Sequence, residues 1–239
     1  MNSLKLKPMN EGNPILHQNL DRVRERIREA AEAAGRSPAD ITLIGVTKYV
    51  TPNQAAALRI AGCVDLGESR PQQLWTKAEQ VPHARWHLVG HLQRNKVRQT
   101  VPLVTLIHSV DSHRLLASIE REAHEINQRV DVLLEVNVSG DASKYGLTGD
   151  ELPRLLEKAI ECSHVHVCGL MTMAAREGGP VVAGHNFAAL RMLRDQFSDQ
   201  VSPNINLSEL SMGMSGDFET AIAEGSTMVR IGSLLWEGC

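Results

Sequence analysis

The chain has one long amphipathic stretch near its start, from about residue 14 to residue 34. Its apolar residues recur in steps of three and four, which places them along one face of an α-helix. They are Leu16, Leu20, Val23, Ile27, Ala30, Ala31 and Ala34. Asn13 is a favourable N-cap, Pro14 suits the first helical position, and Gly35 is typical of the position just past a helix end. The pattern predicts a helix with one buried face.

Beyond that helix, short apolar runs alternate with longer amphipathic stretches. The runs are rich in Val, Ile and Leu, as expected for strands that are buried on both faces of a parallel sheet. They lie at residues 41–46, 63–67 and 86–90, within 103–110, and at 131–139, 165–171, 209–212 and 228–232. The predicted helices lie at residues 52–61, 71–79, 93–99, 112–128, 150–162, 184–197 and 217–224.

These strand–helix units follow one another without a linker or a break in composition, and this predicts an α/β fold, a single (β/α)8 TIM barrel with an additional N-terminal helix. An open doubly wound sheet is the alternative. In both folds, functional side chains lie where the strands end. Only seven residues follow the last strand, so we expect the N-terminal helix to help cover the barrel there. We assign residues 1–239 to one domain and residues 1–12 to a flexible N-terminal tail.

Composition narrows the class of protein further. Hydrophobic residues make up 42% of the 239 residues and charged residues 22%, which is typical of a globular protein. A net charge of -3 and only three Trp, two Tyr and three Phe argue against a nucleic-acid partner. No apolar run reaches the roughly 18 residues of a membrane span, and no secretory signal is evident. We therefore expect a cytoplasmic protein that binds neither nucleic acid nor membrane.

The four cysteines, Cys63, Cys162, Cys168 and Cys239, form no C-x-x-C pair. Such spacing carries neither a zinc nor a redox signature, and it predicts free thiols, with Cys239 exposed at the tail. The histidines give no better ligand set. His83, His87 and His91 do not share a helical face, while His164 and His166 are expected to alternate on one strand face. These residues therefore predict no metal site.

Lys48 is the first candidate for chemistry, because it closes the otherwise apolar first strand and is expected at the barrel mouth. Apolar surroundings there would favour the neutral amine, which is a nucleophile towards carbonyl groups. A surface lysine that merely follows a strand is the alternative interpretation.

The segments around the last two strands carry the second candidate site. The loop after residues 209–212 combines small residues with hydroxyls and leads into a helix, and Gly232-Ser233 directly follows the last strand. Barrels often hold phosphate with the loops after strands seven and eight, although Ser/Gly loops also occur simply as turns. A phosphorylated aldehyde cofactor would use both the lysine and the phosphate site, as would a phosphorylated sugar that forms a Schiff base.

Several motifs resemble those of one family, the pyridoxal phosphate homeostasis proteins. The resemblance runs in order from about residue 15 to residue 235. The matching segments are 46–48, 86–96, 108–111, 135–139, 143–146, 169–171, 210–215 and 225–233. It departs from the family pattern where Ser69-Arg70 replaces the usual Asn-Tyr after Gly67-Glu68, and in the tail around Trp236.

The resemblance implies a barrel similar to the alanine racemase N-terminal domain, with pyridoxal 5'-phosphate (PLP) bound as a covalent aldimine at Lys48. It also implies that phosphate is held by the backbone and hydroxyls of Ser211, Met214, Ser215, Gly232 and Ser233. Arg230 would face the pyridine nitrogen. A guanidinium accepts no proton, so that nitrogen would stay unprotonated and the cofactor would be a weaker electron sink than in transaminases.

The function that the resemblance implies is PLP homeostasis: the protein would hold the cofactor and release it to PLP-dependent apoenzymes, without strong catalysis of its own, as a monomer. A PLP-dependent amino-acid racemase is the alternative. Racemases of this fold take a tyrosine base from a second domain, for which 239 residues leave no room, and Tyr49 and Tyr145 are the only tyrosines. Tyr49 is expected to point away from Lys48, because neighbouring strand residues face opposite sides. A Schiff-base aldolase acting on a phosphorylated sugar is a third interpretation.

Overall fold

The computed structural model describes residues 13–141, 144–199 and 202–239. The flexible tail predicted at residues 1–12 lies outside this part of the chain. Within it, eight parallel strands form a closed barrel in sequence order. The strands are β1 (Thr42–Val46), β2 (Asp65–Glu68), β3 (Arg85–Leu88), β4 (Leu106–Val110), β5 (Val130–Glu135), β6 (Val165–Met171), β7 (Ile205–Met214) and β8 (Met228–Ile231). The predicted (β/α)8 barrel is confirmed, and the doubly wound alternative is wrong, because β8 pairs with β1 and closes the sheet.

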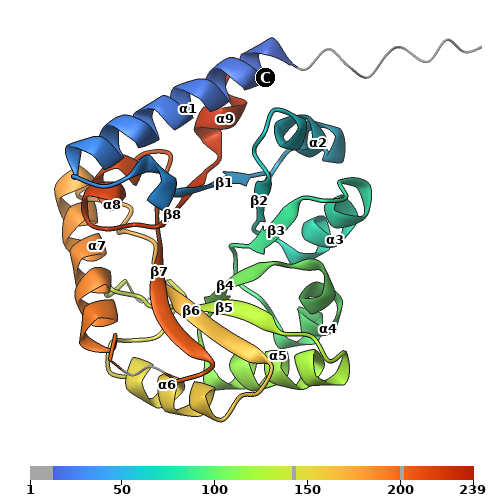
Figure 1. Ribbon diagram of the computed structural model, residues 1–239, viewed down its shortest axis with the longest axis vertical. Helices are drawn as coiled ribbons and strands as arrows, with labels where there is room; N and C mark the ends of the chain where they lie inside the picture. The colour runs from blue at the N-terminus through green and yellow to red at the C-terminus, as the bar shows by residue number, and fades with distance from the viewer. Residues whose placement is uncertain (1–12, 142–143, 200–201) are drawn as a thin grey trace, which may run out of the picture.

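The helices surround the barrel, as Figure 1 shows. They are α1 (Pro14–Ala33), α2 (Pro52–Ile60), α3 (Pro71–Gln80), α4 (Val97–Thr100), α5 (His113–Glu125), α6 (Leu152–Ile160), α7 (Gly179–Gln196), α8 (Phe218–Ala223) and α9 (Ser233–Trp236). Their starts follow local chemistry. For α2, Pro52 stands in the first turn, and Thr51 and Gln54 form a capping box.

The structure corrects the predicted bounds of several elements: β5 ends at Glu135 rather than Ser139, and β7 and α7 begin earlier than predicted. Strand β7 spans Ile205–Met214, whereas the sequence predicted only 209–212. Its first half alternates buried Ile205 and Leu207 with exposed Asn206 and Ser208, a pattern too short to read beside the polar residues around it. Helix α7 starts at Gly179, five residues before the predicted start, because Pro180 fits its first turn.

The additional N-terminal helix, α1, covers the barrel beside β8, because the helix that follows β8, α9, is only four residues long. Leu16, Leu20 and Val23 are buried on the inner side of α1, which packs against α8 and α9. The Asn19 amide donates hydrogen bonds to the carbonyls of Leu235, at 3.1 Å, and Glu237, at 2.8 Å. Helix α1 is therefore tied to the end of the chain, as Figure 1 shows by its position beside α9.

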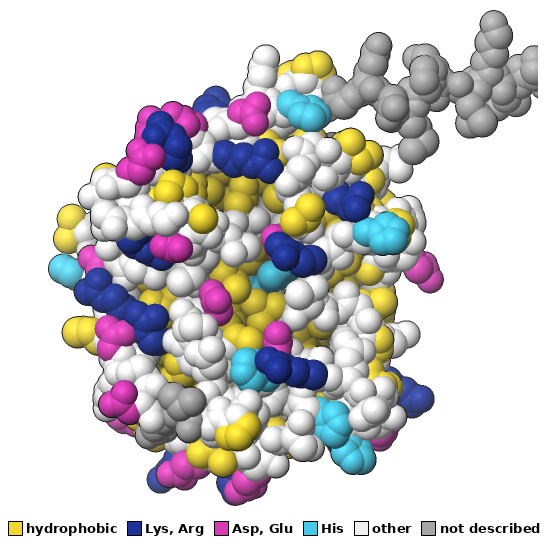
Figure 2. All heavy atoms as spheres, in the orientation of Figure 1, with side chains coloured by type: hydrophobic (Ala, Val, Ile, Leu, Met, Phe, Trp, Pro, Cys, Tyr) yellow, Lys and Arg dark blue, Asp and Glu magenta, His cyan; other side chains and the backbone are white. Residues whose placement is uncertain are grey.

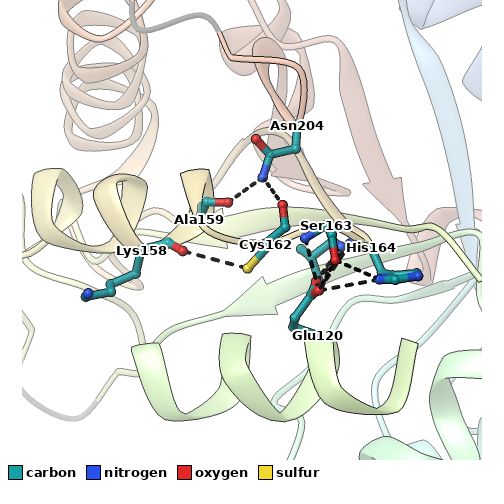
Figure 3. A network of polar contacts seen from close by, with 8 residues as sticks. Glu120, Lys158, Ala159, Cys162, Ser163, His164 and Asn204 are labelled. Carbon is teal, nitrogen blue, oxygen red and sulfur yellow. Dashed lines mark hydrogen bonds and ion pairs between the residues drawn. The ribbon is translucent and has the colours of Figure 1, made fainter. Parts of the chain in front are cut away.

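The carboxylate of Glu120, on α5, is hydrogen-bonded to the turn between α6 and β6, as shown in Figure 3. The Glu120 carboxylate accepts hydrogen bonds from the backbone N–H groups of Ser163, His164 and Val165. Although partial burial acts to raise it, the pKa of Glu120 falls to about 2 because these N–H groups stabilise its charge. This contact sets where β6 begins.

The four cysteines are free, as predicted, and Cys239 is exposed. No helix in the described part of the chain is long and apolar enough to cross a membrane.

Candidate functional site

Lys48 lies at the end of the barrel where the strands terminate, but two residues past the end of β1. It stands in a turn, its side chain is exposed, and it borders a cavity of about 430 Å³ together with Glu68 and Arg70. The apolar surroundings that the sequence predicted for Lys48 are therefore wrong. The reason is that β1 ends at Val46, so the apolar strand interior does not extend to this residue.

A buried ion pair lies directly beneath the turn that carries Lys48. The Lys77 ammonium, on α3, donates a 2.7 Å hydrogen bond to the carbonyl of Thr47 and lies 3.2 Å from the Glu68 carboxylate. Both side chains are only 1% exposed. Burial raises the pKa of Glu68, and Lys77 opposes this shift. Lys77 therefore fixes the backbone immediately before Lys48.

The loops after β7 and β8 meet beside the end of β1. The Gly232 N–H donates a hydrogen bond to the Ser215 hydroxyl at 3.2 Å, which joins the two loops. The Trp236 indole donates to the Val46 carbonyl at 2.8 Å, so the segment after β8 also contacts β1. Because β7, β8 and β1 are neighbours in the closed barrel, Lys48, Ser215 and Gly232 share one end of it.

Small residues let the chain turn back onto the barrel at the end of β7. Gly213 has a φ of 93°, and a Cβ atom there would lie 2.6 Å from the Cβ of Ala221. A side chain is therefore excluded by both the backbone conformation and the space. Met214 follows and is exposed, with its N–H donated to the Asp217 carboxylate at 2.6 Å. Ser233, at the start of α9, is exposed.

Arg230 lies inside the barrel and is held by neighbours on both sides. Its guanidinium donates to the Ser211 hydroxyl at 2.6 Å and to the Thr172 carbonyl at 2.9 Å. The Ser211 hydroxyl also lies 2.8 Å from a ring nitrogen of His108. Burial lowers the pKa of Arg230 to about 10, with Glu135 and Asp217 opposing, so the group is a cation at neutral pH. Ser211 is thus enclosed between an arginine and a histidine.

The interior of the barrel carries further polar groups for which the sequence analysis assigned no role. Burial, with the neighbouring His87 and Arg230 charges, lowers the pKa of His108 well below its usual value, so this imidazole is neutral. Burial and the Asp111 carboxylate raise the pKa of Glu135 to about 7, while Arg230 opposes them. Polar residues facing inward in otherwise apolar strands were the signal that could have found His108 and Glu135.

One of the two tyrosines, Tyr49, differs from expectation. Tyr49 does not point away along a strand, because it lies in the turn after β1 with a φ of 70° and 86% exposure. The Lys48 ammonium lies 5.8 Å from its ring. Tyr145 stacks on His91 with a centroid separation of 4.1 Å, and His91 lies 3.2 Å from the Asp111 carboxylate. The histidine pattern also differs, because His164 precedes β6 and only His166 lies on the strand.

The site thus joins an exposed lysine after β1, hydroxyl and amide groups after β7 and β8, and a buried arginine on β8. With the closed barrel, this arrangement defines an alanine racemase-type barrel. A family model described as alanine racemase, N-terminal domain, matches residues 18–238. An alanine racemase of Clostridium difficile has a TM-score of 0.72 at 15% identity, a likeness of fold that covers 93% of this chain and 56% of the racemase chain.

Closer relatives specify the family within that class. A pyridoxal phosphate homeostasis protein of Aquifex aeolicus is 41% identical over 92% of this chain and 96% of its own length. A pyridoxal phosphate homeostasis protein of Pseudomonas aeruginosa is 37% identical over 92% of this chain and 94% of its own length. The structure of PipY from Synechococcus elongatus with PLP bound has a TM-score of 0.82 and 30% identity, covering 92% of this chain and 99% of PipY. The chain belongs to the pyridoxal phosphate homeostasis protein family.

Proposed function

We propose that this protein binds PLP, holds it as an aldimine at Lys48 and releases it to PLP-dependent apoenzymes. The observation that carries the proposal is the meeting of the β7 and β8 loops, through Ser215 and Gly232, beside the strand that leads to Lys48. Family membership and the PLP bound to PipY support the same ligand. Attack of the Lys48 amine on the aldehyde forms the C=N bond and releases one water molecule.

The phosphate fits the two joined loops. Ser215 and Ser233 offer hydroxyl groups, and Ser233 also offers a backbone N–H group, which suits a phosphate oxyanion. The N–H groups of Met214 and Gly232 donate to Asp217 and Ser215 in this structure, and in our proposal they turn to the phosphate when it binds. Ser211 contributes differently, because its hydroxyl already contacts Arg230 and His108. We assign Ser211 to positioning Arg230 rather than to direct contact with phosphate.

Arg230 limits the chemistry that the bound cofactor supports. Its guanidinium carries its own proton, so it cannot keep a pyridine nitrogen protonated as a carboxylate does. The cofactor then withdraws electrons weakly, which suits storage better than transamination. The tyrosines favour the same conclusion over racemisation. Tyr49 is almost wholly exposed and Tyr145 is stacked on His91, so neither is held by the barrel as an enclosed proton donor opposite Lys48.

We further propose that the protein acts in the cytoplasm and that it does so as a monomer. The motivating observation is that Lys48 and the loops after β7 and β8 all come from one chain. Sedimentation of the PLP-loaded protein tests whether it is a monomer. A stable dimer of the loaded protein would contradict the proposal.

Absorbance spectroscopy tests the covalent link. Addition of PLP to the purified protein should produce an absorbance band at about 420 nm, because the lysine amine and the cofactor aldehyde form an imine. Borohydride reduction followed by peptide mass spectrometry should place the label on Lys48. Lys48→Ala should lose both signals, while Lys158→Ala, an exposed lysine on α6, should keep them. A K48A protein that retains the band would disprove the assignment.

Transfer of the cofactor tests the homeostasis role separately. The loaded protein is mixed with a PLP-dependent apoenzyme, and recovery of that enzyme's activity is followed with and without a trap for free PLP. We expect recovery in both cases, and chiral analysis with alanine and serine should show no turnover approaching about 1 per second. Turnover of that size would instead favour the racemase interpretation.

A further inference from the structure

The opposite end of the barrel, where the strands begin, contains a second cavity. Its volume is about 310 Å³, and its lining includes the first residues of several strands, among them Thr42, Asp65 and Arg85. Figure 2 shows a hollow near the middle of the molecule, with apolar side chains in its depth and histidine, acidic and basic side chains around it. The PLP site lies at the other ends of the same strands, so this cavity is separate from it.

Three potential metal ligands of different chemistry converge on one side of this cavity. Among the residues that the structure describes, Asp131, His166 and Cys168 are the one group of three such side chains with ligand atoms within 4.8 Å of one another. All three line the cavity and are partly buried. The imidazole Nδ1 of His166 is 3.2 Å from the Cys168 sulfur and 3.2 Å from a carboxylate oxygen of Asp131.

The sheet itself holds these residues together. Asp131 on β5 and His166 on β6 are register partners, so their side chains leave the sheet on the same face. Cys168 is two residues after His166, and the pairing of β5 with β6 is irregular just there, because Val132 pairs with Val167 and Leu133 with Gly169. The extra residue on β6 is Cys168, and a bulge of this kind is a common means of aiming one side chain.

Two of the three ligand separations lie close to the edges of a tetrahedral zinc site, and the third is no more than 4.8 Å. Bonds of about 2.0–2.1 Å to nitrogen and oxygen and about 2.3 Å to sulfur give ligand separations of roughly 3.3–3.6 Å. The two observed separations of 3.2 Å need only a small widening to admit an ion. Sulfur, imidazole and carboxylate together suit a borderline metal rather than calcium or magnesium. A fourth position faces the cavity, which has room for water.

We propose that Asp131, His166 and Cys168 bind a zinc ion, as a three-ligand site that is open to the cavity. Arg129 now lies 3.1 Å from the Asp131 carboxylate. Its Nε donates to Oδ1, the same oxygen that lies 3.2 Å from the His166 Nδ1, so Arg129 helps to orient the carboxylate beside the imidazole. The sequence could not group these residues, because Asp131 meets the other two only through strand pairing.

Cobalt substitution provides the test, because Co²⁺ adopts zinc geometry and reports a sulfur ligand by a charge-transfer band. The protein is stripped with chelator, desalted and titrated with Co²⁺ and then with Zn²⁺. We expect one equivalent to bind, with intense tetrahedral visible bands and a near-ultraviolet sulfur-to-cobalt band. Zn²⁺ should abolish both signals by displacing the Co²⁺.

Matched cysteine variants show which cysteine supplies the sulfur ligand of the metal. Cys168→Ser should lose the sulfur band and bind Zn²⁺ at least roughly 100-fold more weakly, whereas Cys162→Ser, a half-buried thiol outside the cluster, should bind as the parent does. Circular dichroism checks folding, and Asp131→Asn serves as a second ligand variant if C168S does not fold. A sulfur band that persists in C168S, or binding of Co²⁺ without any sulfur band, would overturn the proposal. So would the absence of stoichiometric binding.

Discussion

At the scale of single residues, the ion pair of Lys77 and Glu68 holds the backbone just before the turn that carries Lys48. Lys77→Met leaves Glu68 buried without its partner and frees the Thr47 carbonyl. We expect a loss of about 3–5 kcal/mol in the free energy of unfolding, as is typical when one member of a buried pair is removed. Urea denaturation measures this loss. PLP affinity should fall as well, because the backbone before Lys48 loses its anchor.

Two further variants separate the charge effect from simple damage to packing. Lys77→Met combined with Glu68→Gln removes both charges, and it should be more stable than K77M alone. Lys158→Ala removes a lysine whose ion pair with Glu161 is exposed, and its unfolding should match the parent within error. A double variant no more stable than K77M would show that the ion pair is not the cause.

Glu135 gives a pH dependence with a defined sign. Its pKa is raised in the folded protein to about 7, so the folded state keeps a proton that the unfolded state releases from about pH 4.5. The resulting stability is fully present below that pH and is lost as the pH rises through 7. Against Glu135→Gln, the parent should therefore lose up to about 3 kcal/mol of relative unfolding free energy between pH 4.5 and pH 8.

That difference is best measured by chemical denaturation of both cofactor-free proteins at matched pH values. Other titrating groups are common to both and cancel in the comparison. A difference that stays constant with pH, or that grows in favour of the parent above pH 7, would mean that Glu135 is not held in its protonated form.

Local sequence predicted the positions of single residues in the fold where their neighbours in the chain define them. Lys48, Ser215 and Gly232 lie at one end of the barrel, as expected, because each stands just after a strand. Lys77 was missed, since in a helix pattern it reads as a surface lysine. His108 was missed as well, because its partner Ser211 is 103 residues away, and no local pattern reports such a contact.

At the scale of elements, the turn that leads out of β7 depends on Gly213. Gly213→Ala places a Cβ against Ala221 in a backbone conformation that side chains rarely adopt, and we expect a cost of about 1–3 kcal/mol. PLP should bind more weakly, because the distorted loop carries Ser215. Gly216→Ala is the matched control in the same loop, since its Cβ would meet nothing within 4 Å and its φ is not positive. Equal effects of the two variants on unfolding and PLP titration would refute this role.

The elements themselves could be predicted because barrel strands are buried on both faces and are therefore nearly continuous apolar runs. Strand β6 matched its predicted bounds of 165–171, and α1 ended within a residue of the expected end. The errors arose where tertiary pairing extends an element through polar residues, as in the first half of β7. The bulge that aims Cys168 was equally invisible, because it is a property of two paired strands.

At the scale of the whole molecule, the barrel closes where β1 meets β8, and α1 lies across the helices beside that closure. The strands on either side carry Lys48 and the Gly232 loop, so closure and cofactor binding should weaken together.

Leu20, on α1, is 1% exposed. Leu20→Ala is expected to cost about 2–5 kcal/mol, because it leaves a cavity between α1 and the barrel helices. Ile15→Ala on the same helix is the control, since Ile15 is 43% exposed. Urea denaturation with and without PLP measures both effects. If L20A lowers stability but leaves the PLP dissociation constant unchanged in the folded protein, α1 supports the fold without shaping the site.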